Sequence, residues 1–410
     1  MLIRIVAFLL LFPSLAWAEA APVFSDTGPE AEAYGAPGYP VSQIGPNRLQ
    51  QFLVGAFSHF GELNPTHAVR RPAQPFPLKR ASSEMGVSYS YQDSPRNLAD
   101  YLKRHPTTGL LILRGDTILF EHYQYARRDT DRFTSHSMAK TITGMLIGIA
   151  ISEGAIRSVD DPASAYVPEL AGSEIGKTPI RALLHMASGI EFTEVYDGKD
   201  DAAKMNRELV SRLSPGAAAV VAQFNNRTAP PDKVWHYAGL NSETLGLVLS
   251  RAVKMSVAAY AESRIWQKIG AEADASWGVD RTGQEMTACC FIAVLRDWGR
   301  LGLLLANDGA WNGVQVVPRQ WVLDATTPAA LGSFLAPRTA TPFYGYGYQV
   351  WLMPHERRIF AFLGIHGQVI FVDPQSKFVL VHTAARKRPS GDPMGNELIA
   401  LWIALLRQHS

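Results

Sequence analysis

The chain has 410 residues, of which 47% are hydrophobic and 19% are charged, and its formal net charge is +2. This is the composition of a globular protein with enough residues for one large domain or two. The nearly balanced charge, without a basic run interleaved with aromatic residues, argues against a nucleic acid or a strongly anionic partner.

The N-terminus has the three parts of a secretory signal peptide. Arg4 provides a basic start, residues 5–12 are apolar, and an Ala-Trp-Ala sequence precedes Glu19. We therefore expect residues 1–18 to be cleaved on export to the periplasm or the medium. The alternative, an uncleaved anchor, is disfavoured because the apolar run is too short to cross a bilayer. No later segment is apolar enough to predict a membrane-spanning helix.

The first half of the chain changes from an irregular lead-in to regular elements. Residues 20–80 are rich in proline and glycine, which predicts an extended arm packed on the body of the protein. Residues 108–126 predict a β-hairpin, because two β-rich runs flank an Arg-Gly-Asp turn at 114–116. An apolar helix is expected over residues 137–150, and Gly154 ends it.

The second half is predicted to be helical first and then strand-rich. Residues 178–274 have apolar side chains at helical spacing, and a further helix is expected over 293–306. Consecutive strands joined by short turns imply an antiparallel sheet, which we expect the hairpin to join. The predicted strands lie within residues 344–353, 357–364, 368–374 and 377–385, before a last amphipathic helix at 396–408.

This order predicts an α+β fold in which helices flank the antiparallel sheet and a mainly helical lobe lies beside it. The predicted parts are a signal peptide (1–18), an N-terminal arm (19–95), an α/β lobe (96–177 and 275–410) and a mainly helical lobe (178–274). A site would lie in the cleft between the lobes.

The two cysteines, Cys289 and Cys290, are adjacent. Adjacent cysteines rarely pair, because a disulfide requires Cβ atoms directed at each other. We therefore expect two small buried residues and no disulfide. A redox-active vicinal pair is the alternative.

Ser137 and Lys140 are the first candidates for chemistry. Residues three apart lie on one face of a helix, so the two side chains are neighbours. A helix start presents backbone N–H groups that favour negative charge, and a desolvated lysine can accept a proton. The alternative is a solvated serine and lysine, since S-x-x-K recurs by chance about once in a few hundred residues. In this chain it occurs once, at a predicted helix start.

Tyr237 is the third candidate, between a proline-rich turn and a predicted helix. Nearby positive charge favours the phenolate, so a tyrosine close to Lys140 could move protons. The alternative is a tyrosine packed at a loop–helix junction. His136 and His236 each precede a candidate catalytic residue, and we interpret both as packing residues because direct neighbours point in different directions.

Motifs of several enzyme and cofactor classes are missing from the sequence. There is no G-x-S-x-G nucleophile elbow, no H-E-x-x-H metal motif and no glycine-rich phosphate loop. The sequence therefore predicts neither an α/β-hydrolase nor a metal site. No cofactor is expected, because side chains and backbone suffice for the chemistry.

Three motifs carry a resemblance to a known family. Ser-Met-Ala-Lys at 137–140, Tyr-x-x-x-Asn-x-x-x-Leu-Gly at 237–246 and GIHGQVIFVDP at 364–374 occur in order. With LLHMASGIEFTEVY and LRDWGRLGLLLANDG, they resemble the serine hydrolases related to class C β-lactamases and penicillin-binding proteins. Within that group the chain most resembles carboxylesterases and 6-aminohexanoate-dimer hydrolases. The resemblance extends from about residue 99 to the end and implies a β-lactamase/transpeptidase-like fold.

The resemblance also implies roles for individual residues. Ser137 would form an acyl-enzyme, Lys140 would keep the proton network poised, and Tyr237 would act as base and return the proton to the leaving group. The oxyanion hole would use the backbone N–H groups of Ser137 and Ile365. Substrate-binding residues would be Tyr196, Asn241, Gly364 and His366.

Two departures from the family pattern matter. Where penicillin-recognising relatives carry Lys-Thr-Gly, this chain has Phe-Leu-Gly at 362–364, so the cation for a substrate carboxylate is missing. Where relatives have Tyr-x-Asn or Tyr-x-Ser, this chain has Gly239, so Asn241 or a water would have to support Lys140.

We therefore predict a serine hydrolase that cleaves a small ester or linear amide. One alternative is a β-lactamase or D-amino-acid peptidase acting on peptidoglycan-type substrates. Another is a non-catalytic binding protein on the same fold, which Gly239 favours and which the joint presence of Ser137, Lys140 and Tyr237 disfavours. The sequence does not predict an oligomeric state.

Overall fold

The computed structural model describes residues 19–42, 49–391 and 394–409. The predicted signal peptide lies outside these ranges and stays a prediction. Within the described ranges no helix combines the length and the apolar character that crossing a membrane would require.

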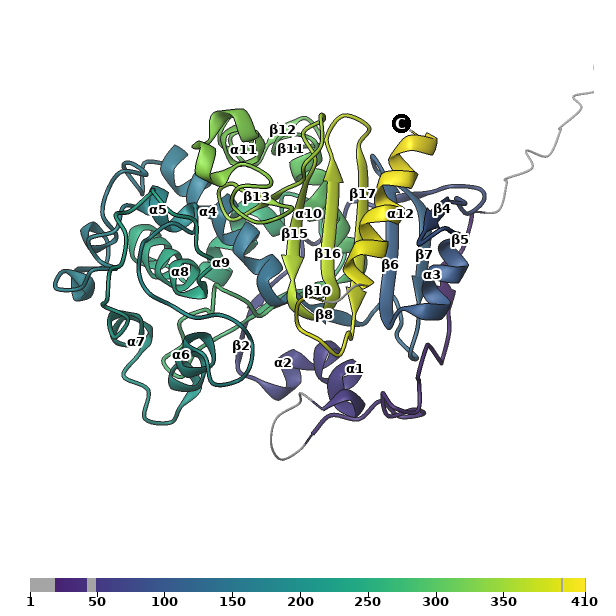
Figure 1. The fold of residues 1–410 in the computed structure, drawn as a ribbon, viewed down its shortest axis with the longest axis horizontal. Helices are drawn as coiled ribbons and strands as arrows, with labels where there is room; N and C mark the ends of the chain where they lie inside the picture. The colour runs from purple at the N-terminus through teal and green to yellow at the C-terminus, as the bar shows by residue number, and fades with distance from the viewer. Residues whose placement is uncertain (1–18, 43–48, 392–393, 410) are drawn as a thin grey trace, which may run out of the picture.

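The main sheet is formed by the early hairpin and the C-terminal strands, as predicted (Figure 1). Its strand order is β1-β7-β6-β17-β16-β15-β14-β13, and β3 also pairs with β7. All neighbours from β7 through β6, β17, β16, β15 and β14 to β13 pair antiparallel. In contrast, β1 and β3 run parallel to β7, so the whole sheet is mixed. The strands are β1 (Val23–Phe24), β3 (Lys79–Arg80), β6 (Thr107–Arg114), β7 (Thr117–Tyr123), β13 (Gly345–Tyr346), β14 (Trp351–Leu352), β15 (Phe360–Gly364), β16 (Gln368–Asp373) and β17 (Phe378–Ala384).

Helices cover both faces of this sheet, which explains its continuous apolar strands. Leu111 and Val381 face α10 (Leu295–Ala306), whereas their strand neighbours Leu110 and Leu380 belong to a second cluster under α12 (Met394–His409). Gly302 lets α10 approach closely, because a Cβ at this position would lie 2.6 Å from Val379. The α3 helix (Leu98–Arg104) packs on the same side as α12.

The opposite end of the molecule is mainly helical (Figure 1). At its centre lies α4 (Ala139–Ser152), whose residues 139–150 are all buried, packed against α8 (Gly239–Val253). An apolar helix with few polar positions is buried on all sides, which is what the sequence of α4 indicates. The helices around this pair are α5 (Ile180–Leu184), α6 (Asp201–Val210), α7 (Ala217–Ala222) and α9 (Val257–Ala261).

A smaller sheet connects the two ends of the molecule. Its order is β2-β9-β10-β8, and β8 leads directly into the turn that carries Ser137. The strands are β2 (Thr66–Val69), β8 (Arg132–Thr134), β9 (Ala275–Gly278) and β10 (Phe291–Val294). Other elements are β4 (Ser88–Tyr91), β5 (Ser94–Asn97), β11 (Ala310–Trp311), β12 (Val314–Gln315) and α11 (Arg319–Thr326).

The N-terminal arm is less extended than predicted. It contains α1 (Gln50–Ser58) and the short α2 (Phe60–Leu63), and α1 packs near β8. The sequence LQQFLVGAFS lacks proline and has apolar residues that pack, so a helix forms inside a proline-rich segment.

The prediction that the two cysteines stay unpaired is wrong, because Cys289 and Cys290 form a disulfide. The backbone makes this possible: Cys290 has a φ of 74°, in the left-handed region, and the turn brings the two neighbouring side chains together.

Candidate active site

Ser137 lies in a single 3₁₀ turn, His136–Met138, between β8 and the start of α4. The residue before this turn is fixed to β10 in both directions. Ser135 donates its backbone N–H to the carbonyl oxygen of Phe291 at 2.7 Å, and its hydroxyl accepts from the N–H of Phe291 at 3.0 Å. The nucleophile candidate is therefore held at a helix start by a neighbouring sheet.

Lys140 contacts Ser137 as the helical spacing predicts. Its Nζ lies 3.2 Å from Ser137 Oγ and donates to the carbonyl oxygen of Ala288 at 2.6 Å. The side chain is buried, and burial lowers the pKa of Lys140, although the charges of Glu194 and Glu243 raise it. A lowered pKa increases the fraction of neutral amine that can accept a proton.

Tyr237 completes the cluster. Its hydroxyl hydrogen bonds to Ser137, and Lys140 Nζ lies 5.2 Å from the centre of its ring. Burial and the charge of Glu194 raise the pKa of Tyr237 well above 10, while the bond to Ser137 lowers it. The expected phenolate is therefore disfavoured, because desolvation outweighs the nearby positive charge. At neutral pH Tyr237 holds its proton.

The end of β15 approaches the nucleophile turn closely. A Cβ at Gly364 would lie 2.5 Å from the carbonyl oxygen of Ser135 and 3.2 Å from the Cβ of His136. Only glycine permits this contact. Ile365 follows at once, so its backbone lies beside the turn that contains Ser137, where the resemblance expects the second oxyanion donor.

Glu194, which the sequence did not single out, lies beside Gly239, the residue that departs from the family pattern. Its Oε2 accepts from the backbone N–H of Gly239 at 2.5 Å, and its Oε1 accepts from the hydroxyl of Tyr196 at 2.9 Å. A Cβ at Gly239 would be 3.1 Å from Glu194 Oε2. Tyr196 is thus connected to Gly239 through Glu194, and its role in binding substrate stays a prediction. No local signal identifies Glu194, since it is 45 residues from Gly239 in the chain.

Glu243 is a second carboxyl group that sequence reasoning missed. It accepts from the backbone N–H groups of Thr287 at 3.1 Å and of Ala288 at 3.0 Å. Burial raises the pKa of Glu243 to about 7, and the two N–H groups and Lys140 oppose that rise. Ala288 is therefore bonded on its N–H side by Glu243 and on its carbonyl side by Lys140.

Asn241 does not join the catalytic cluster. It is fully buried within α8, and its amide nitrogen donates to Sδ of Met186 at 3.6 Å. No hydrogen bond between Asn241 and Lys140 therefore supports the suggestion that Asn241 assists Lys140. The space beside Gly239 is occupied by Glu194 instead, because Gly239 has no side chain.

His366 lies in the turn after β15 and faces the nucleophile segment. Its ring centre is 5.5 Å from that of His136, and Phe57 of α1 contacts both rings, at 5.2 Å and 4.7 Å. Nδ1 of His366 lies 2.6 Å from the carbonyl oxygen of Arg386. The arm thus supplies a side chain next to the candidate site. His236 is instead exposed, with Nε2 2.5 Å from the carbonyl oxygen of Phe192.

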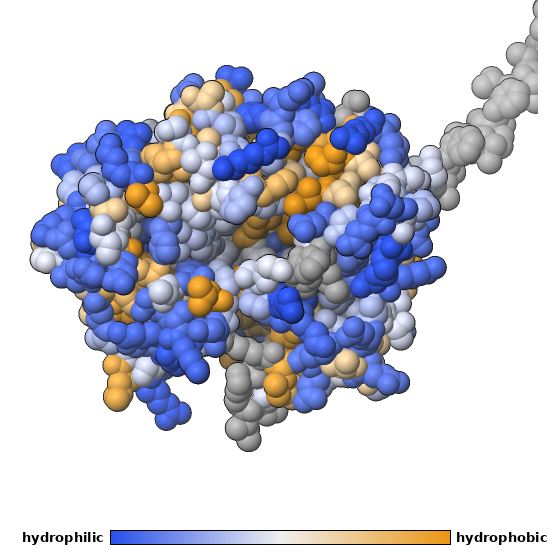
Figure 2. Space-filling view, viewed as in Figure 1, coloured by the Kyte–Doolittle hydropathy of each residue, from blue (hydrophilic) through white to orange (hydrophobic). Residues whose placement is uncertain are grey.

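An aromatic cluster surrounds Tyr237. The rings of Tyr237 and Trp351 stack with centres 5.4 Å apart, and Trp235 and Tyr346 contact both of them. The viewed face of the molecule is hollowed near its centre, where the helical end meets the strands (Figure 2). Phe362, which stands where penicillin-recognising relatives carry lysine, is fully buried in the core.

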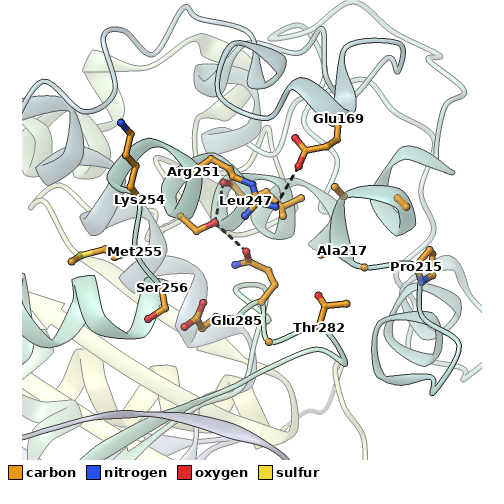
Figure 3. A pocket seen from close by; sticks show the side chains of 16 residues that line it. Glu169, Pro215, Ala217, Leu247, Arg251, Lys254, Met255, Ser256, Thr282 and Glu285 are labelled. Carbon is orange, nitrogen blue, oxygen red and sulfur yellow. Dashed lines mark hydrogen bonds and ion pairs between the residues drawn. The ribbon is translucent and has the colours of Figure 1, made fainter.

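A separate cavity of about 770 Å³ lies between α7, α8 and the loop after β9 (Figure 3). None of the three candidate catalytic residues lines it. Its serines have structural partners, because Ser250 bonds Gln284 at 3.0 Å and Ser256 caps α9. Arg251 pairs with Glu169 at 3.4 Å. The cavity thus lacks a nucleophile beside a base. Across the described ranges, no group of three or more His, Cys, Asp or Glu residues could hold a metal ion.

Comparisons with known proteins identify the family of the chain. The family model described as Beta-lactamase matches residues 95–402. The chain is 27% identical over 340 residues to the 6-aminohexanoate-dimer hydrolase of Paenarthrobacter ureafaciens, covering 82% of this chain and 86% of the relative.

Two solved structures share the fold. One from Bacillus anthracis, named for 6-aminohexanoate-dimer hydrolase, has a TM-score of 0.77 at 23% identity, covering 87% of this chain and 95% of the other. A penicillin binding protein from Bacillus halodurans has a TM-score of 0.56 at 16% identity, covering 73% and 96%. The predicted fold class and family resemblance are confirmed. The chain belongs to the beta-lactamase family, as a hydrolase related to the 6-aminohexanoate-dimer hydrolases.

Proposed function

We propose that this protein is a serine hydrolase that cleaves a small ester or a linear amide through an acyl-enzyme on Ser137. The observation that carries the proposal is the joint contact of Ser137 Oγ with Lys140 Nζ at 3.2 Å and with the hydroxyl of Tyr237. A hydroxyl bonded to both a buried amine and a phenol has a route for losing its proton as it attacks.

In acylation, Ser137 Oγ attacks the carbonyl carbon, and its proton passes to the neutral amine of Lys140, directly or through the hydroxyl of Tyr237. The backbone N–H groups of Ser137 and Ile365 receive the oxyanion. The bond to the leaving group then breaks, Tyr237 donates a proton to the departing alcohol or amine, and Lys140 restores the proton of Tyr237.

In deacylation, a water attacks the acyl carbon and gives its proton to Lys140, directly or through the hydroxyl of Tyr237. The ester bond to Ser137 breaks, Oγ regains a proton, and the acid product leaves. The net reaction consumes one water and yields an acid with an alcohol or an amine. No cofactor enters any step.

The side chains near the catalytic residues indicate the class of substrate. Buried apolar Phe362 offers no cation for a substrate carboxylate, and aromatic rings line Tyr237. Both features favour acyl groups that carry no carboxylate over penicillin-type substrates. The relative from Paenarthrobacter ureafaciens is named as a 6-aminohexanoate-dimer hydrolase. A linear dimer of an amino acid is joined by an amide bond, so we propose such amides alongside small esters.

The test is hydrolysis of p-nitrophenyl acetate and p-nitrophenyl butyrate by the wild type, Ser137→Ala and Tyr237→Phe. Loss of the nucleophile or the proton-transfer group should lower kcat/KM by roughly a hundredfold or more. Ser135→Ala is unsuitable as a control because Ser135 bonds Phe291, so exposed Ser90→Ala is the matched serine control.

A wild type no faster than Ser137→Ala would overturn the proposal and favour a binding protein. Hydrolysis of the linear 6-aminohexanoate dimer and of nitrocefin by the same variants separates the substrate classes. We expect turnover of the amide dimer and none of nitrocefin.

A further inference from the structure

We infer that Glu194 is a positioning residue for the Lys140–Tyr237 pair and takes the place of the side chain that Gly239 lacks. The inference rests on the proposed function, because it assigns Glu194 a part in the same proton transfer. Three observations carry it: where its carboxylate lies, which groups face it, and what a side chain at residue 239 would meet.

The carboxylate lies where a side chain of residue 239 would begin. Glu194 Oε2 accepts from the Gly239 N–H at 2.5 Å and would be 3.1 Å from a Cβ built there. That distance is shorter than ordinary van der Waals contact, so a larger residue at 239 and the present position of Glu194 are in competition. Gly239 begins α8, where a carboxylate is also favoured by the helix N-terminus.

Glu194 is itself held in place. Its Oε1 accepts from the hydroxyl of Tyr196 at 2.9 Å, and the loop that carries both is fixed by Asp200, which accepts from the N–H groups of Val195 at 2.7 Å and Tyr196 at 2.6 Å. A carboxylate with partners on both oxygens has one preferred orientation. The loop therefore delivers a fixed negative charge to the site.

The Glu194 carboxylate interacts electrostatically with residues of several elements. Glu194 acts electrostatically on Lys140 of α4, on Tyr237 before α8, and on Tyr346 of β13. Glu243 is the other carboxyl group acting on Lys140. A negative charge favours the protonated form of both Lys140 and Tyr237. Removal of the charge should thus move their protonation equilibria to lower pH.

The first experiment compares the wild type with Glu194→Gln, which keeps the shape and an acceptor oxygen but loses the charge. The rising limb of the pH profile of kcat/KM for p-nitrophenyl butyrate, which reports loss of the Lys140 proton, should shift to lower pH by about half a unit to one unit. The matched control is Glu191→Gln, since Glu191 is exposed and bonds Asn226 away from the site. A merely structural role for Glu194 would lower the rate at every pH and leave the rising limb in place.

The second experiment tests whether a side chain at residue 239 can take over the role of Glu194. Glu194→Ala should lower kcat/KM by about tenfold, a typical cost of losing an orienting partner of catalytic groups. Adding Gly239→Asn in that background should recover at least threefold, because the space is then free. Gly239→Asn alone should not raise the rate, because its Cβ meets Glu194.

The outcomes separate this inference from the proposed function. If Ser137→Ala is inactive while Glu194→Gln keeps the wild-type rate and pH profile, the inference fails and the proposed function stands. If Ser137→Ala retains wild-type activity, the proposed function fails. Thermal midpoints of each variant within a few degrees of the wild type establish that the fold is kept, and Glu194→Gln provides the result if Glu194→Ala does not fold.

Discussion

The carbonyl oxygen of Ala288 accepts a hydrogen bond from Lys140 Nζ at 2.6 Å, so the amine that faces Ser137 is anchored to a segment far away in the chain. The same peptide segment is bonded through its N–H to Glu243. Lys140 therefore has a fixed position that does not depend on the substrate. Its low exposure and its two polar contacts are the basis of the first prediction.

Lys140→Arg should abolish most of the activity. Arginine keeps the positive charge and a long side chain, but it does not lose a proton in proteins, so it cannot accept one from Ser137. We expect kcat/KM for p-nitrophenyl butyrate to fall by about a hundredfold or more. In the wild type the rate should rise with pH as Lys140 loses its proton, at a pH below the ordinary value of 10.5.

The control for this substitution is Lys268→Arg, at an exposed position. If Lys140→Arg retained activity within a few-fold of the wild type, Lys140 would not be the proton acceptor.

Glu243 predicts a pH dependence of stability. Burial raises its pKa from 4.5 to about 7, so between these values the folded protein holds a proton that the unfolded chain releases. The contribution of this group to folding stability is therefore largest below pH 4.5 and is lost as the pH rises through 7. The full effect is at most about 3 kcal/mol.

Glu243→Gln should remove this dependence. The thermal midpoint of the variant minus that of the wild type should be about 2 to 5 °C higher at pH 8 than at pH 5. Any destabilisation by the amide that does not depend on pH cancels in this comparison. Differential scanning calorimetry of both proteins measures the difference. Asp297, whose pKa burial also raises to about 7, titrates in both proteins and cancels. A difference independent of pH would contradict the prediction.

Phe57 of the arm should affect catalysis more than folding. Its ring contacts His136 next to the nucleophile and His366 next to the expected oxyanion donor, at 4.7 Å and 5.2 Å. We expect Phe57→Ala to lower kcat/KM by about tenfold through a 1 Å scale displacement of these segments. Phe52→Ala in the same helix is the matched control. Equal losses in both variants would assign the effect to α1 as a whole.

Gly364→Ala should separate β15 from the nucleophile turn. The added Cβ would lie 2.5 Å from the carbonyl oxygen of Ser135, and because that atom is backbone, the strand or the turn must move. We expect a loss of about 1 to 3 kcal/mol of stability together with at least a tenfold loss of kcat/KM. Gly172→Ala is the control, since no atom lies within 4 Å of its added Cβ. Unchanged kinetics in Gly364→Ala would exclude a role for this contact.

Local patterns predicted the parts of the fold that depend on local chemistry. The hairpin over 108–126 and the late strands were recognisable because alternating β-rich runs and turn residues are close in sequence. Ser137 and Lys140 were recognisable for the same reason, because three residues on a helix set their contact. The helix α1 was missed because surrounding prolines obscured a nine-residue helix.

The relationships that shape the site are long-range. Glu194 meets Gly239 across 45 residues, and Glu243 meets Ala288 across the same separation, so neither pair has a signature in a short window. Asn241 was named because it is near in sequence, yet α8 turns its side chain into the core. Tyr237 was expected to ionise from its charged neighbour alone, and burial, which the sequence does not reveal, reverses that expectation.

Because Cys289 and Cys290 are bonded to each other and are the only cysteines in the chain, the oxidised protein offers no thiol to an alkylating reagent. A cysteine introduced at an exposed position would therefore be the single site for a spectroscopic label. Val195 suits this purpose, since the residue is 66% exposed and it stands between Glu194 and Tyr196. A nitroxide or fluorophore there would report directly whether this loop rearranges when an acyl group occupies Ser137.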